Sequence, residues 1–110
     1  MQGSNPQKKG RKMKTIDDTG IKNEHSNGAR TQVLLLENEQ KLFKIAIKSE
    51  SHDFQSYARL YLMADDKTWT LIKSEQPKRD YGIDISYQDR YSQKAFSKII
   101  DSLKELAKKI

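Results

Sequence analysis

The chain has 110 residues, a formal net charge of +6 and no cysteine. This length allows one domain at most. The lack of cysteine excludes disulfides, thiolate zinc sites and a cysteine nucleophile. Small secreted domains are usually rich in disulfides, so the composition favours a cytoplasmic location. No apolar run approaches the roughly 20 residues that span a bilayer, and no apolar stretch of the signal-peptide kind follows the basic N-terminus, so we expect no membrane association.

Residues 1–30 form a polar, basic segment with seven lysines and arginines against three carboxylates. Its glycines and polar residues bury too little apolar area to offset the entropy of ordering, which predicts a flexible arm. Basic arms of this kind are attracted to polyphosphates, although a merely solubilising tail explains the composition equally well. The arm residues expected to contact nucleic acid are Lys8, Lys9, Arg11, Lys12 and Lys14.

Residues 31–110 carry the patterns of a small folded domain. A strand is predicted over residues 31–37, where the continuous apolar run from Val33 to Leu36 indicates burial on both faces. After a turn at residues 37–40, residues 41–48 alternate, with Phe43, Ile45 and Ile47 on one side and lysines on the other. This alternation is typical of a half-buried strand.

A hairpin is predicted next, with strands at residues 55–64 and 68–74 and an acidic turn between them. Ala58, Leu60 and Leu62 are expected to face the core. Residues 75–82 are expected to form a charged loop broken by Pro77, and residues 83–87 a short last strand.

A C-terminal helix is the clearest predicted element, with Ser92 as its N-cap. Its apolar residues fall at helical spacing on one face: Phe96, Ile99, Ile100, Leu103, Leu106, Ala107 and Ile110. The predicted fold is therefore α+β: an antiparallel sheet of four or five strands with one C-terminal helix packed on one face, preceded by a flexible basic N-terminal arm. The other face of such a sheet must be polar, dimerised or occupied by a ligand.

No catalytic, metal or cofactor constellation is visible in the sequence. The two histidines, His25 and His52, lie in polar segments, and the neighbouring side chains of His52 and Asp53 would point to opposite faces of a strand. No glycine-rich phosphate loop or known catalytic motif is present. We therefore expect a protein that is not an enzyme and uses no cofactor.

The aromatic residues of the hairpin suggest a binding surface instead. Aromatic rings beside cations on a sheet form a surface on which bases can stack, although cross-strand pairs that simply cover the sheet explain the rings as well. The residues expected to share this face are Tyr57, Arg59, Tyr61, Trp69 and Lys73, extended by Lys78 and Arg79 in the following loop.

The octapeptide Ser-His-Asp-Phe-Gln-Ser-Tyr-Ala at residues 51–58, followed by a strand and Trp69, resembles a stretch in small uncharacterised proteins of phages and mobile elements. The resemblance covers residues 41–75 and brings no binding residue with it. It implies a setting in which small basic proteins bind DNA or inhibit host defence nucleases. The order of strands followed by a helix is also similar to the single-stranded nucleic-acid-binding coactivator and Pur-type folds, in element order alone.

The favoured interpretation is a small non-enzymatic protein that binds DNA or RNA through its arm and the aromatic face. The alternative is a phage or mobile-element inhibitor or adaptor, of the anti-CRISPR type, that binds a host protein or nucleoprotein. A homodimer remains open under either interpretation, because a domain of about 80 residues is only marginally stable alone.

Overall fold

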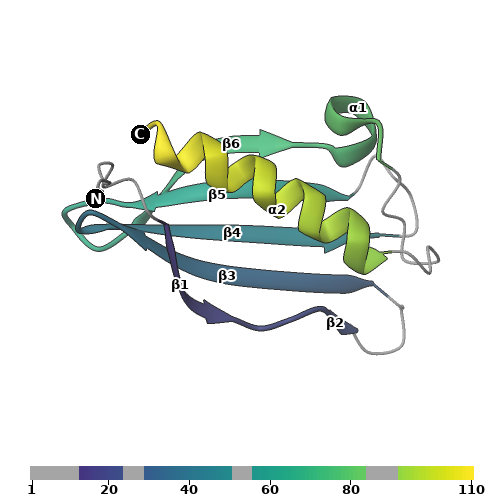
Figure 1. Ribbon diagram of the computed structural model, residues 1–110, viewed down its shortest axis with the longest axis horizontal. Helices are drawn as coiled ribbons and strands as arrows, with labels where there is room; N and C mark the ends of the chain where they lie inside the picture. Colours follow the sequence, from purple (N-terminus) through teal and green to yellow (C-terminus); the bar gives the residue numbers. More distant parts are fainter. Residues whose placement is uncertain (1–12, 24–28, 51–55, 84–91) are drawn as a thin grey trace, which may run out of the picture.

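The structure, a computed structural model, describes residues 13–23, 29–50, 56–83 and 92–110. These residues form six strands and two helices (Figure 1). The elements are β1 (Lys14–Asp18), β2 (Lys22–Asn23), β3 (Arg30–Asn38), β4 (Lys41–Ser49), β5 (Tyr57–Met63), β6 (Trp69–Glu75), α1 (Pro77–Tyr81) and α2 (Ser92–Lys108).

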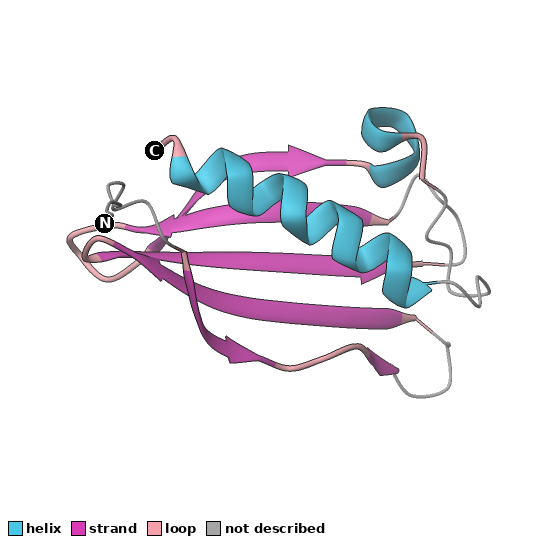
Figure 2. Ribbon diagram, in the orientation of Figure 1, coloured by secondary structure: helices cyan, strands magenta, loops and turns pink. Residues whose placement is uncertain are grey.

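All the strands join one antiparallel sheet in the order β1-β3-β4-β5-β6, and β2 pairs with β3 beside β1. Strands β3 to β6 follow each other as a meander, because neighbours in the sequence are neighbours in the sheet. Helix α2 runs across one face of this sheet (Figures 1 and 2). The predicted α+β architecture is therefore confirmed. No helix in the described part of the chain is long and apolar enough to cross a bilayer.

The core lies between α2 and the sheet. Alternate residues of β3, β4 and β5 point toward the helix, as the two-residue period of a strand requires, and they meet the apolar stripe of α2. The buried members are Leu34, Leu36, Phe43, Ile45, Ile47, Ala58, Leu60, Phe96, Ile99, Ile100, Leu103 and Ala107. The predicted inward faces of the second strand, the hairpin and the helix are thus correct.

The sheet begins earlier than the boundary predicted at residue 30. Strands β1 and β2 lie within the predicted arm and pair with β3, which covers a strand edge that would otherwise expose unpaired backbone groups. Met13 and Ile21 pack against the core, and Gln32 Nε2 donates to Asp18 Oδ1 over 2.9 Å. The part of the predicted arm at residues 1–12 and 24–28 lies outside the described residues.

The predicted charged loop before α2 contains a short helix, α1. Pro77 stands at its first turn, where the missing N–H group costs nothing. Gly82 ends the helix with φ 69° and donates its N–H group to Lys78 O over 3.0 Å, a common way of closing a helix. Of the predicted strand at residues 83–87, Ile83 lies outside any strand and the remainder is not among the described residues.

Candidate nucleic-acid interface

The face of the sheet turned away from α2 is covered by no element of the described chain (Figure 2). We call this surface the open face. Its side chains alternate with the core residues along each strand. Its members on β3 to β6 are Thr31, Val33, Leu35, Glu37, Leu42, Lys44, Ala46, Lys48, Tyr57, Arg59, Tyr61, Met63, Trp69, Leu71 and Ser74.

The apolar residues of the open face remain partly exposed to solvent. The continuous run in β3 predicted burial on both sides, but only Leu34 and Leu36 are buried, whereas Val33 and Leu35 are half-buried on the open face. Leu71 on β6 is 51% exposed. The reason is that, among the described residues, α2 lies across one face of the sheet and no element lies across the other, so the second apolar row of β3 has no described layer to pack against.

A cation and two aromatic rings meet at the centre of the open face. Lys44 on β4 lies directly across from Tyr61 on β5, and its Nζ atom is 4.6 Å from the centroid of that ring. The same Nζ atom is 5.0 Å from the Trp69 ring on β6. Both distances are within the range of cation–π attraction. One ammonium group therefore holds side chains of three adjacent strands together.

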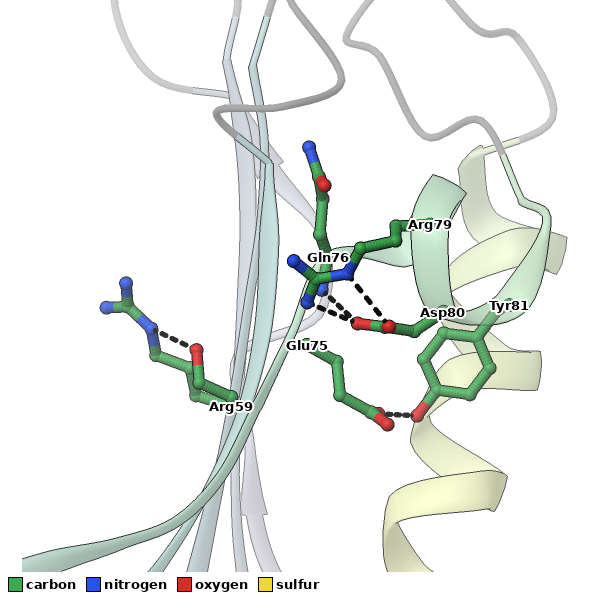
Figure 3. A network of polar contacts seen from close by, with 7 residues as sticks. Arg59, Glu75, Gln76, Arg79, Asp80 and Tyr81 are labelled. Atoms are coloured by element: carbon green, nitrogen blue, oxygen red, sulfur yellow. Dashed lines mark hydrogen bonds and ion pairs between the residues drawn. The ribbon is translucent and has the colours of Figure 1, made fainter.

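A second cation and ring are paired nearer the other end of β5. The guanidinium carbon of Arg59 lies 3.8 Å from the centroid of the Tyr57 ring. Arg59 Nε also donates to Ser74 Oγ over 3.4 Å (Figure 3). The guanidinium is thus held by a ring and by a hydroxyl group, and this restricts the orientations that the long side chain can adopt.

The open face is cationic over β4, β5 and β6, which bring Lys44, Lys48 and Arg59 to it, while Glu75 of β6 faces the α2 side. Strands β3 and β1 bring the carboxylates Glu37 and Asp17 to the same face. Beyond the end of β4, Glu50 forms an ion pair of 3.0 Å with Lys48. Such a surface, with rings interleaved with positive charges, suits an anionic and aromatic ligand.

Lys73 does not belong to the open face, contrary to the prediction. A β-bulge lies between the pairs Leu60–Lys73 and Tyr61–Leu71, so Ile72 is an extra residue in β6. The bulge shifts the alternation by one residue. Lys73 therefore lines a cavity of about 370 Å³ on the α2 side, together with Tyr81 and Ser102.

The other predicted cations lie around the open face or outside the described residues. Lys14 is exposed on β1, at the far edge of the sheet. Lys78 and Arg79 are exposed on α1. Lys8, Lys9, Arg11 and Lys12 fall in residues 1–12, of which the structure gives no description. Sequence reasoning left Lys44 and Lys48 out of the site, although their alternation with Phe43, Ile45 and Ile47 already assigns them to the open face.

Charged groups at α1 form a compact network (Figure 3). Arg79 Nε and Nη2 donate to the two carboxylate oxygens of Asp80 over 3.0 and 2.8 Å. Together with the backbone N–H group of Gln76, Arg79 lowers the pKa of Asp80 to about 2. The Tyr81 hydroxyl donates to Glu75, and burial together with this carboxylate raises the pKa of Tyr81 to about 12.

The described residues contain no cluster of histidines and carboxylates that could hold a metal ion. His52 and Asp53, considered as an acid–base pair in the sequence, are not among the residues that the structure describes. Comparison of this chain with protein families, with curated proteins and with solved structures finds no match.

Proposed function

We propose that this chain is a non-enzymatic protein of the cytoplasm that binds single-stranded nucleic acid on its open face. The observation that carries this proposal is the arrangement of Lys44 against Tyr61 and Trp69, repeated by Arg59 on Tyr57. Rings offer stacking surfaces to unpaired bases, and the adjacent cations attract the phosphates. Bases within a duplex are already stacked, so the surface favours a single strand over a double strand.

The shape of the surface supports the same interpretation. The open face spans adjacent strands, and no helix or strand of the described residues lies over it, so an extended nucleic-acid strand has room to lie on it. Base stacking on aromatic side chains contributes about 1–3 kcal/mol per base. Tyr57, Tyr61 and Trp69 therefore provide enough binding free energy for a short segment of strand, to which Lys8, Lys9, Arg11 and Lys12 would add phosphate contacts.

The experiment uses Trp69, which is the single tryptophan of the chain. Single-stranded DNA, duplex DNA and RNA oligonucleotides are titrated into the full chain at three salt concentrations, and the tryptophan emission is recorded with the anisotropy of a labelled strand. We expect the single strands to quench Trp69 and to bind more weakly as salt rises, because each neutralised phosphate releases counterions. Unchanged emission with all three nucleic acids at low salt would contradict the proposal.

A second candidate function rests on the apolar part of the open face. Val33, Leu35 and Leu71 are incompletely buried, and contiguous exposed apolar surface is typical of protein interfaces. A host protein or nucleoprotein, engaged by an inhibitor or adaptor of phage type, or a second copy of this chain, would cover these residues. A pull-down from host lysate before and after nuclease treatment separates the two candidates, since a protein partner stays bound after digestion.

A further inference from the structure

A polar pocket lies at one end of the open face, where β5, β6 and α1 meet. Its volume is about 220 Å³, and it adjoins the ring of Tyr57, so it is continuous with the aromatic surface. Its polar lining comes from three separate elements and includes two arginines. The lining residues used below are Ser56, Tyr57, Arg59, Ser74, Gln76 and Arg79.

Arg59 is held in place and retains free donors. The stacking on Tyr57 and the bond from Nε to Ser74 Oγ restrict its guanidinium. Both Nη nitrogens have no hydrogen-bond partner within the described part of the chain. A guanidinium whose orientation is fixed and whose Nη–H groups have no hydrogen-bond partner is well placed to bind an anion.

Arg79 is held in a similar way from the opposite side of the pocket. Asp80 engages Nε and Nη2, and the carboxylate is itself held by the Gln76 backbone N–H group over 2.7 Å. In Figure 3 the guanidinium of Arg79 extends from α1 toward the strands, and Arg59 lies on the other side of these strands. Its Nη1 nitrogen has no partner among the described residues.

Two carboxylates lie near the pocket. Asp80 is ionised at neutral pH and orients Arg79, and its bonds from Arg79 and Gln76 lower its pKa to about 2. Glu75 also lines the pocket, and one of its oxygens accepts from the Tyr81 hydroxyl on the α2 side of the sheet. The two Nη nitrogens of Arg59 and Nη1 of Arg79 are donors without a partner among the described residues, as an anion site requires.

We infer that this pocket binds a phosphate group between Arg59 and Arg79. The inference rests on the proposed function, because the phosphate would belong to the strand whose bases stack on Tyr57, Tyr61 and Trp69. Guanidinium forks match the geometry of phosphate oxygens, and two of them bind such a group more specifically than scattered lysines do. The pocket would then set the position of the strand along the open face.

The test begins with inorganic phosphate and needs no nucleic acid. The full chain, labelled with ¹⁵N, is titrated with phosphate at constant ionic strength, and the side-chain Nε–H signals of Arg59 and Arg79 are followed by NMR with the amide of Gln76. We expect saturable shifts at these groups, lost in Arg79→Gln and kept in Lys98→Gln. Lys98→Gln is the control, since it removes the same charge from an exposed position of α2 outside the pocket lining. Shifts that never saturate, or that both variants lose equally, would overturn the inference.

A second arm titrates a short single-stranded oligonucleotide into the parent chain and into the variants. We expect Arg79→Gln to weaken binding several-fold, because the contact with one phosphate is lost, and Lys98→Gln to leave it nearly unchanged. If circular dichroism shows that Arg79→Gln does not fold, Arg59→Gln replaces it in both measurements. If neither Arg59→Gln nor Arg79→Gln changes the affinity for the oligonucleotide, the phosphate pocket is contradicted and the proposed function is not. Phosphate binding here without binding of any oligonucleotide supports the pocket and contradicts the proposed function.

Discussion

Lys44 and Tyr61 lie directly opposite each other on β4 and β5, and the ammonium group rests 4.6 Å from the ring centroid. The same ammonium reaches Trp69 on the next strand. Cation–π contacts at exposed sites contribute about 0.5–1 kcal/mol, which is too little to define the fold. Their consequence is local: they hold two rings and a charge in fixed positions on a face that no described element covers.

Replacing Lys44 by methionine removes the charge and keeps a long unbranched side chain. We expect weaker binding of single-stranded oligonucleotides and a salt slope less steep by about 0.7, the contribution of one phosphate contact on a single strand. Anisotropy titrations at several salt concentrations measure both quantities. Lys98→Met, on an exposed position of α2, is the control and should leave the slope unchanged. Equal changes in the two variants would show that only net charge matters.

Replacing Tyr61 by alanine removes a ring from the centre of the open face. We expect binding of a single strand to weaken by about 1–3 kcal/mol, the range measured for one stacked base. Tyr61→Phe keeps the ring and should retain most of the affinity, and isothermal titration calorimetry compares the two variants. If the phenylalanine variant binds as weakly as the alanine variant, the hydroxyl group rather than stacking is responsible.

The turn between β3 and β4 carries backbone strain. Glu39 and Gln40 have φ values of 51° and 72°, in the left-handed region that costs a residue with a Cβ atom roughly 1–2 kcal/mol. Turns of this kind favour Asn-Gly, so Glu39→Asn combined with Gln40→Gly should stabilise the domain by about 1 kcal/mol and raise Tm by roughly 4–8 °C. Thermal unfolding followed by circular dichroism tests this, with Gln40→Ala as the control that keeps the strain. An unchanged Tm in the double variant would contradict the argument.

Asp80 should make the stability depend on acid pH. Arg79 and the Gln76 N–H group lower its folded-state pKa from 3.8 to about 2, so the unfolded chain takes up this proton at a higher pH than the folded chain does. The stabilisation is complete above pH 4 and is lost as pH falls through about 2. We therefore expect the difference in Tm between the parent chain and Asp80→Asn to shrink between pH 5 and pH 2. A constant difference in Tm over this range would mean that the Asp80 carboxylate does not form these hydrogen bonds with Arg79 and Gln76 in solution.

The candidate site was partly predictable from spacing alone. Tyr57, Arg59 and Tyr61 are two residues apart, so any strand through them brings them to one face, and their alternation with Ala58 and Leu60 identifies the face away from the core. Lys73 was misplaced because a bulge leaves no local mark in an ordinary sequence of strand residues. Arg79 was expected to extend the face that carries Arg59, but the pocket that both residues line could not be predicted, since it depends on a helix that was predicted as a loop.

The elements whose apolar residues repeat with a clear period could be predicted from local spacing alone. Phe96, Ile99 and Leu103 specify the buried face of α2, and Phe43 and Ile45 that of β4, because the period of each element assigns side chains to faces without reference to other segments. Fold class and the orientation of the hairpin follow from the same rule.

Which of these faces meet depends on the tertiary structure. The pairing of β1 with β3, the extra residue Ile72 and the approach of Lys44 to Trp69 each depend on the register between strands. Register is set by how all the strands pack together on α2, and local spacing carries no record of it. The open face likewise arises from the packing, because α2 lies across one side of the sheet and no described element lies across the other.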